Sequence, residues 1–261
     1  MIKSLFTAAT GMDAQQTRIA VIANNIANMN TTGFKASRAE FQDLIYETRQ
    51  TPGGETASGV NAPTGLQVGS GVNVVATQNL FTQGTMEQTA NPLDVSIEGK
   101  GFFSVQLPSG DIAYTRAGAL SINSSGALVN QNGFPVQPAV TVNPQASDRR
   151  IGIDGTISAT APGATAPTVE GQIQVWTFAN DAGLSSIGRN LFRETSASGA
   201  GTSGIAGNAG FGTIRQGFLE SSNVNIAEEL IKMILSQRAY ELNGKVISTS
   251  DQMLSSTTQL R

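Results

Sequence analysis

The sequence of 261 residues contains no cysteine and no histidine. The absence of cysteine excludes disulfides and thiolate metal sites. Without either residue type, the chain lacks the commonest general base, the commonest metal ligand and the most reactive nucleophile. Both absences therefore count against an enzyme.

Charged residues and long apolar runs are also scarce. Charged side chains make up 13% of the chain and the net charge is -3, which gives no basic surface for nucleic acid. No apolar run approaches the roughly 18 residues that span a bilayer. The first residues, "MIKSLFTAATGMDAQQ", hold too short an apolar stretch for a secretory signal. We expect no nucleic-acid partner, no membrane insertion and, if the chain is exported, no cleaved signal peptide.

The first proline-free segment predicts a helix from Ser4 to about Met29. Its apolar residues recur three and four positions apart. Ser4 is the expected N-cap and Gly33 the expected terminator. The apolar rows of this helix contain Leu5, Met12, Ile19 and Ile26, with Ala8, Ile22 and Met29 alongside them.

Three asparagines, Asn24, Asn25 and Asn28, interrupt this pattern. Asparagine is a poor helix former because its side chain competes for backbone hydrogen bonds. Two interpretations stay open: the asparagines mark a fraying helix end, or their amides meet another protein surface.

A second helix is predicted from Ile226 to about Leu260. Asn225 precedes it and Glu228 follows three positions later, which is an Asn-led variant of the capping box. One apolar row contains Leu235, Ala239, Leu242, Val246, Met253 and Leu260, and another contains Ile226, Leu230, Met233, Tyr240, Ile247 and Leu254. Two apolar rows predict contacts on more than one side.

Between the helices, short β-branched and aromatic runs alternate with turn residues. This pattern predicts an antiparallel β domain over residues 91–208. The Gly- and Pro-rich stretch 48–71 is interpreted as a long loop or extended arm. The predicted fold class is α+β, with a discontinuous coiled-coil-like helical domain, an inserted all-β domain and an extended arm. The expected domains are 1–30 plus 225–261, 31–90 plus 209–224, and 91–208.

No motif in the chain carries a reaction. The stretch "GAGTSG", Gly199 to Gly204, matches the dinucleotide fingerprint but is not followed by a good helix start, so we interpret it as a flexible linker. No phosphate-binding loop, nucleophile elbow or S-x-x-K pair occurs. We therefore expect no enzyme, no cofactor and no metal.

The two ends of the chain resemble a known family. "ANNIANMNTTGFKASRAEF", Ala23 to Phe41, resembles the N-terminal signature of the flagellar axial proteins, which form rod and hook. "SNVNIAEELIKMILSQRAYELNGKVISTSDQML", Ser222 to Leu254, resembles their C-terminal signature. The central stretches "NPLDVSIEGKGFF" and "YTRAGALSINSSGALV" are also similar, so the resemblance extends over nearly the whole chain. The stretch 46–72 looks like the extended segment of the distal-rod type.

This resemblance implies a structural subunit in the rod of the flagellar basal body, in the periplasm. The terminal helices would form an inner tube around the export channel, the arm would stiffen the polymer, and the rod would transmit torque. The implied partners are copies of the chain itself, proximal rod proteins, the hook protein, the outer rings around the rod and the flagellar type III export apparatus. The stretch "FQDLI", with Phe41 and Ile45, matches a pattern of exported rod and hook proteins.

The residues expected to carry assembly follow from these patterns. The helix interface contains Leu5, Met12, Ile19, Ile22, Asn24, Asn25, Ile26, Asn28, Leu230, Met233, Leu235, Tyr240, Leu242, Val246 and Met253. The stiffening arm contains Thr48, Pro52, Gly53, Pro63, Gly65, Leu66 and Gly71. Between copies, the asparagine amides would set register, so we expect Asn25→Leu to disturb polymer order more than folding.

Three alternatives stay open. The first is a proximal rod or hook subunit of the same family. The second is a β-rich surface adhesin with helical ends, which predicts an ordered monomer that binds a ligand. The third is an enzyme, which detection of a dissociable cofactor or hydrolytic turnover would favour.

Overall fold

The computed structural model describes residues 2–51, 53, 55–57, 60–61, 63–146, 148–162 and 166–259. The fold is α+β, as predicted, with two long α-helices and an antiparallel β-rich middle. Its residues form two compact units. The helical unit comprises Met1–Ile26, Ser37–Gln78 and Asn225–Arg261, and the β unit comprises Ala27–Ala36 and Asn79–Val224. Residues 37–78 of the expected arm region thus belong with the helices, and residues 209–224 with the β strands.

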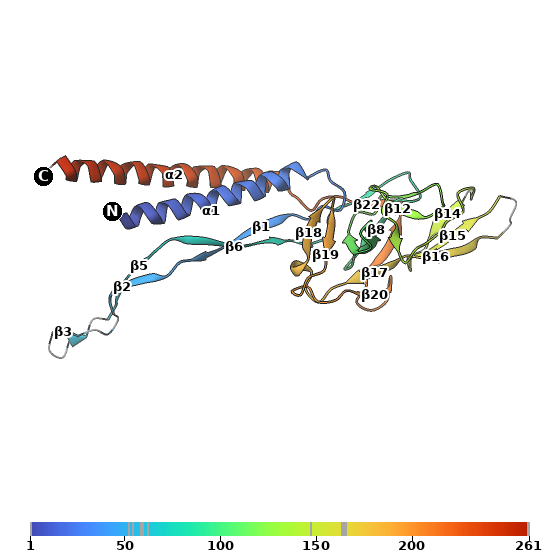
Figure 1. Ribbon diagram of the computed structural model, residues 1–261, viewed down its shortest axis with the longest axis horizontal. Coiled ribbons are helices and arrows are strands. Elements are labelled where there is room, and N and C mark those ends of the chain that lie inside the picture. The colour runs from blue at the N-terminus through green and yellow to red at the C-terminus, as the bar shows by residue number, and fades with distance from the viewer. Residues whose placement is uncertain are drawn as a thin grey trace. The chain divides into compact units, whose positions relative to one another are not determined.

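The two helices of the helical unit are α1 (Ile2–Ala27) and α2 (Ile226–Gln259). They run side by side in opposite directions (Figure 1). Ser4 lies inside α1 and is not its N-cap. Its Oγ lies 3.4 Å from Ser250 Oγ of α2.

The end of α1 also differs from the expectation, because the helix stops at Ala27 and Gly33 does not terminate it. The chain turns over Asn28, where Thr31 donates to Asn28 O from its N–H at 3.1 Å and to Asn28 Oδ1 from its hydroxyl at 3.2 Å. Gly33 has a φ of 71°. A Cβ there would lie 2.5 Å from Ala117 N, so glycine is required by a close backbone approach.

The predicted arm is a β ribbon and not a long loop. Strand β2 (Tyr46–Gln50) pairs antiparallel with β5 (Leu66–Gly69), and β3 (Glu55–Ala57) pairs with β4 (Val60–Asn61). Strand β1 (Ser37–Asp43) pairs with β6 (Val72–Asn79). β-branched residues within this Gly-rich stretch, and Tyr46 just before it, favour strands.

The ribbon approaches α1 at Thr10 and at Lys3. A Cβ at Gly71, where φ is 125°, would lie 2.2 Å from Thr10 Oγ1, and Val72 N donates to the same oxygen at 3.4 Å. Lys3 forms an ion pair with Glu47 of β2. Thr48 lies in β2 and the half-exposed Leu66 in β5, while Gly53, Pro63 and Gly65 lie between strands. Pro52 lies outside the described residues.

The β unit contains the remaining strands. They are β7 (Met86–Gln88), β8 (Val95–Glu98), β9 (Phe103–Gln106), β10 (Ile112–Thr115), β11 (Leu120–Ile122), β12 (Leu128–Asn130), β13 (Val136–Gln137), β14 (Asp148–Ile151), β15 (Thr156–Thr160), β16 (Thr168–Gln172), β17 (Gln174–Thr177), β18 (Ser185–Gly188), β19 (Leu191–Arg193), β20 (Thr202–Ile205), β21 (Thr213–Gln216) and β22 (Phe218–Glu220), with a short 3-10 helix at Asp181–Gly183.

These strands form one five-stranded sheet in the order β13-β9-β10-β19-β18, one three-stranded sheet, β14-β15-β16, and several strand pairs. The "GAGTSG" stretch is not a linker, because Thr202–Ile205 pairs with β17 as strand β20. The core includes fully buried side chains from several of these sheets: Val95, Ile97, Phe103, Val105, Val136, Ile157, Ile173, Val175 and Ile214.

A second, aromatic core cluster surrounds Tyr114. Phe178 meets it edge-on at 4.8 Å between ring centroids, and Trp176 lies at 5.6 Å. The Tyr114 hydroxyl donates to Glu194 Oε2 at 3.4 Å. Burial, reinforced by the charge of Glu194, raises the pKa of Tyr114 from 10.0 to about 12.

We expect this tyrosine to produce a pH dependence in alkali. Between pH 10 and 12 the unfolded chain releases the Tyr114 proton and the folded chain keeps it, so the free energy of unfolding falls as pH rises. Phenolate absorbance should show a titration step near pH 12 that Tyr114→Phe removes. Persistence of that step in the variant would contradict the assignment.

Candidate assembly surface

Helix α2 begins at a side-chain cap. Asn225 Oδ1 accepts from the N–H of Ala227 at 3.1 Å and of Glu228 at 3.5 Å. The Asn225 amide donates to Glu228 Oε1 at 3.3 Å. These bonds occupy backbone donors at the first turn and fix where α2 starts.

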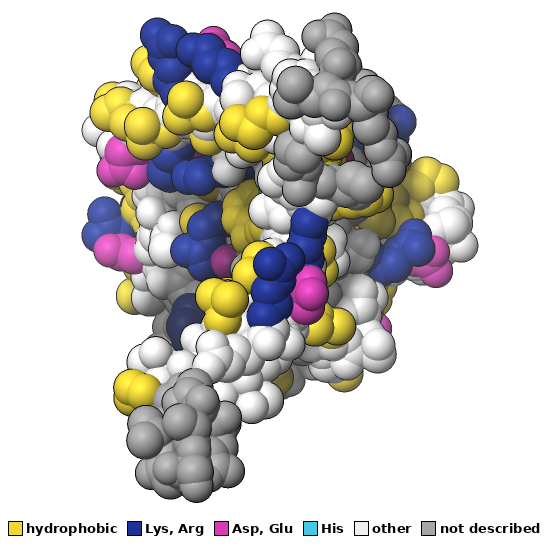
Figure 2. All heavy atoms as spheres, turned by 90° about the vertical axis from the view of Figure 1, so that its left-hand side faces the viewer, with side chains coloured by type: hydrophobic (Ala, Val, Ile, Leu, Met, Phe, Trp, Pro, Cys, Tyr) yellow, Lys and Arg dark blue, Asp and Glu magenta, His cyan; other side chains and the backbone are white. Residues whose placement is uncertain are grey.

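The outer face of α2 is apolar and exposed. Leu235 and Leu242 are each 60% exposed within the structure. The exposed apolar residues of α2 are Ile226, Leu230, Ile231, Ile234, Leu235, Tyr240, Leu242, Val246 and Met253. We call these residues the α2 outer face, apart from Val246, which lines a hollow beside α1. Figure 2 views the molecule from the left-hand side of Figure 1, and it shows hydrophobic side chains at the surface. A series of exposed leucine and isoleucine side chains on one helix is a feature of interaction surfaces.

The inner face of α2, by contrast, is partly polar. The buried residues of α2 are Glu229, Ser236 and Ser250, while Met233, Ile247 and Leu254 are partly buried. Glu229 accepts from Lys232 Nζ at 2.7 Å and from Asn25 Nδ2 of α1 at 3.2 Å. The most buried side chains of α2 are therefore polar, and Leu230, Leu235 and Leu242 are left exposed.

Most apolar residues of α1 are more buried, although Phe6 is 67% exposed. Leu5, Met12, Ile19 and Ile26 are partly buried, as is Met233 of α2. Ile22 is 3% exposed, so its assignment to an interface between copies is wrong. A buried side chain inside the helical unit has no surface to offer to a neighbour.

Asn25 is the clearest correction among the predicted site residues. Its side chain is 2% exposed, and all its polar atoms are used within the helical unit. Nδ2 donates to Ser37 O at 2.9 Å and to Glu229, while Oδ1 accepts from Ser37 N at 2.9 Å. The amide connects α1, β1 and α2 within one chain, so it cannot meet another copy.

The other two asparagines differ from Asn25. Asn24 is exposed on α1, and Asn28 forms the turn after the helix through its bonds with Thr31. The expectation that either contacts another copy stays a prediction.

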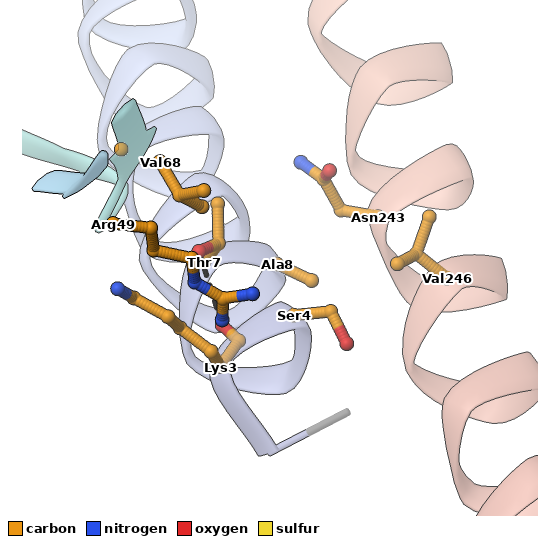
Figure 3. Close-up of a pocket in the computed structure, with 9 residues that line it drawn as sticks. Lys3, Ser4, Thr7, Ala8, Arg49, Val68, Asn243 and Val246 are labelled. Atoms are coloured by element: carbon orange, nitrogen blue, oxygen red, sulfur yellow. Dashed lines mark hydrogen bonds between the residues drawn. The ribbon is translucent and has the colours of Figure 1, made fainter. Parts of the chain in front are cut away.

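A hollow of about 450 Å³ lies within the helical unit. Its lining comes from α1 (Lys3, Ser4, Thr7 and Ala8), the ribbon (Arg49, Val68 and Gly69) and α2 (Asn243 and Val246). In Figure 3, Asn243 and Val246 point from α2 toward the side of α1 that carries Ser4 and Ala8. The two helices therefore have unfilled space between them near this point.

The residues of the export-type pattern lie on the ribbon. Phe41 lies in β1 and is 37% exposed, while Ile45 follows β1 and is 85% exposed. Both side chains are accessible in the folded helical unit, and their role in export stays a prediction.

Sequence reasoning missed a buried ion cluster in the β unit. Glu220, 0% exposed, accepts from Lys35 Nζ at 2.6 Å and from Arg116 Nη1 at 3.4 Å. Glu220 Oε1 also accepts from Gly84 N at 2.9 Å. Lys35 donates to Thr82 O at 2.7 Å, and Arg116 Nη2 donates to Gly99 O at 2.8 Å.

Burial dominates the electrostatics of this cluster. It lowers the pKa of Lys35, although the charge of Glu220 opposes the shift and the charge of Arg116 adds to it. The guanidinium of Arg116 lies 5.4 Å from the centre of the Phe102 ring. Residues 35, 116 and 220 are far apart in sequence, so no local pattern predicts that they meet. The one sequence signal for the cluster is that Lys35 and Arg116 lie in stretches that resemble the flagellar axial proteins.

Among the described residues, no group of three or more acidic side chains is arranged to hold a metal ion. No α-helix in the described part of the chain is long and apolar enough to cross a membrane.

Three families match parts of the chain. Residues 5–35 match "Flagella basal body rod protein", residues 96–159 match "Flagellar hook protein FlgE/F/G D1 domain", and residues 215–260 match "Flagellar basal body rod FlgEFG protein C-terminal". The matched regions include α1, much of the β unit, and α2.

Curated relatives match over the full length. The flagellar basal-body rod protein FlgG of Caulobacter vibrioides is 49% identical, with 100% of both chains covered. The FlgG proteins of Buchnera aphidicola subsp. Schizaphis graminum and of Borreliella burgdorferi are each 47% identical, with 100% of this chain and 100% and 99% of those proteins covered. The chain therefore belongs to the family of flagellar basal-body rod proteins.

Proposed function

We propose that the chain is a subunit of the distal rod, in which many copies stack around a common axis and transmit torque to the hook. The observation that carries this proposal is the α2 outer face, whose leucines are left exposed while polar residues are buried. Covering one half-exposed leucine contributes on the order of 1 kcal/mol. A contact that repeats without closing makes a helical filament, so this small gain recurs at every copy.

The ribbon supports the same arrangement. Strands β2 and β5 form a two-stranded sheet in the described residues, and such a pair is marginal by itself in water. Tyr46 and Leu66 are half-exposed on it. In the proposed polymer, neighbouring copies cover these side chains, and the arm stiffens the rod.

The remaining partners follow from the place of a distal rod. Proximal rod proteins and the hook protein meet the two ends of the polymer, the outer rings surround it, and the flagellar type III apparatus exports the subunits. The inner tube formed by the terminal helices encloses the export channel. The FlgG relatives at 47–49% identity support the distal position.

The proposal is tested by making the α2 outer face polar. Leu235→Ser with Leu242→Ser should leave the urea unfolding curve nearly unchanged, because both side chains are 60% exposed. Cells in which this variant replaces the native subunit should lack complete rods in electron micrographs and should not swim.

Gln237→Ser is the matched control, because it changes an exposed polar residue of the same helix. It should give complete rods. Complete rods and normal swimming in the double leucine variant would refute the proposal.

A further inference from the structure

The contacts between α1 and α2 repeat at heptad spacing. Ser4 meets Ser250 with 3.4 Å between hydroxyl oxygens, and Asn25 donates to Glu229 at 3.2 Å. Between them, a Cβ added to Gly11 would lie 2.9 Å from Asn243 Nδ2. The α1 positions 4, 11 and 25 and the α2 positions 250, 243 and 229 differ by multiples of seven. We call these six residues, with Ser236, the polar seam.

The polar seam departs from the usual arrangement of a helix pair, because it buries polar side chains beside the partly buried apolar residues Met233, Ile247 and Leu254. Paired helices normally bury their apolar stripes against each other and leave polar side chains in water. Here Ser236 is 1% exposed and Leu235 beside it is 60% exposed. Burial of apolar area alone would favour a different rotation of α2, with its leucines against α1.

Specific contacts of the polar seam oppose that rotation. Turning α2 would separate Asn25 from Glu229 and Ser4 from Ser250. It would also move Asn243 away from Gly11, whose missing side chain allows the close approach. Polar pairs at heptad positions are known to fix register at a cost in stability.

We propose that the polar seam determines the rotation of α2 about its axis and thereby keeps the α2 outer face available for a second copy of the chain. The inference rests on the proposed polymerisation and adds the residues that make it specific. The polar seam prevents one chain from covering its own leucines.

The first test makes part of the polar seam apolar. Asn243→Leu with Ser250→Leu uses two seam positions of α2: Asn243 lines the hollow between the helices, and Ser250 meets Ser4, which also lines it. The circular dichroism of α-helix should be retained, because leucine is a good helix former. Complete rods are counted in micrographs of cells in which the variant replaces the native subunit. Their number should fall by about an order of magnitude, because a rotated α2 no longer presents its outer face to the next copy.

A control pair separates rotation from added hydrophobicity. Gln237→Leu with Gln252→Leu adds two leucines at exposed positions of α2 outside the polar seam. This pair should keep the number of complete rods within about twofold of the unmodified chain. An equal loss in both pairs, or no loss in the seam variant, overturns the proposal.

The second test fixes the polar seam covalently. The chain has no cysteine, so Ser4→Cys with Ser250→Cys places the only two thiols opposite each other across α1 and α2. The disulfide is detected by gel mobility without reductant. Rods should form equally well from oxidised and reduced chain, and loss of rods on oxidation would show that the polar seam opens in the polymer and overturn the proposal.

Failure of the proposed function gives a different result. If the unmodified chain restores no rods in these cells, the polymerisation itself is wrong. If it restores rods and the two leucine pairs behave alike, only the role of the polar seam is wrong.

Discussion

Replacing Glu220 with glutamine should lower the free energy of unfolding of the β unit by about 3–5 kcal/mol. The substitution keeps the shape of the side chain but removes the only carboxylate that contacts Lys35 and Arg116 in the described structure. Both cations then stay buried without a carboxylate in contact, although the charge of Asp181 still acts on Arg116. The loss is measured by urea unfolding followed through the fluorescence of Trp176, the single tryptophan, which lies in the β unit.

Glu98→Gln is the matched control in the same unit. Glu98 pairs with Arg215 at 2.7 Å, but both side chains are about half exposed. An exposed ion pair contributes about 0–1 kcal/mol, so this variant should unfold almost as the unmodified chain does. Equal losses from the two substitutions would show that burial of the cluster has no special energetic effect.

A second substitution identifies the cause of the Glu220→Gln loss. Adding Lys35→Met removes one unpaired buried cation, so the double variant should be more stable than Glu220→Gln alone. Raising the pH into the alkaline range should also stabilise the Glu220→Gln variant. Because the pKa of Lys35 is lowered in the folded chain, the folded state sheds its proton first, and stability rises as pH approaches 10.5.

Asn25→Leu should lower the free energy of unfolding of the helical unit by about 2–4 kcal/mol. Leucine cannot bond Ser37 N or Ser37 O, and it removes one donor from the buried carboxylate of Glu229. Each buried polar group left without its partner costs about 1–3 kcal/mol. Urea unfolding followed by far-ultraviolet circular dichroism reports this unit, because α1 and α2 provide the long helices.

Asn24→Leu is the control for this substitution, because Asn24 is the neighbouring asparagine on an exposed position. It should change stability by less than about 0.5 kcal/mol. The structure thus reverses the expectation from sequence that Asn25→Leu mainly disturbs polymer order. A stable Asn25→Leu monomer with disordered rods would restore that first interpretation.

The two helices and the β-rich middle were predictable because their signals are local. The apolar spacing and the Asn225 cap predict α2, and the alternation of strand and turn residues predicts the β unit. The ribbon was missed as regular structure because Gly and Pro dominate residues 48–71, although strand-forming residues lie among them.

The partners of the side chains were harder to predict, because they depend on tertiary contacts. An apolar row on α2 is expected to face α1, so the pattern gave no sign that Glu229 and Ser236 face it instead. Lys35, Arg116 and Glu220 each resemble surface residues when considered alone. Only the fold brings them within hydrogen-bond distance.

The chain passes between the two units four times, after Ile26, Ala36, Gln78 and Val224, and bonds inside the β unit join the segments next to these crossings. Gly33 N donates to Glu220 O at 2.7 Å, and Ala36 N donates to Asn223 Oδ1 at 2.8 Å. The segment from Asn79 to Val224 is therefore a cassette whose two ends are held together, because Asn223 Nδ2 also donates to Leu80 O at 2.8 Å. Evolution or an engineer could enlarge or graft that cassette without changing the sequence of the helices.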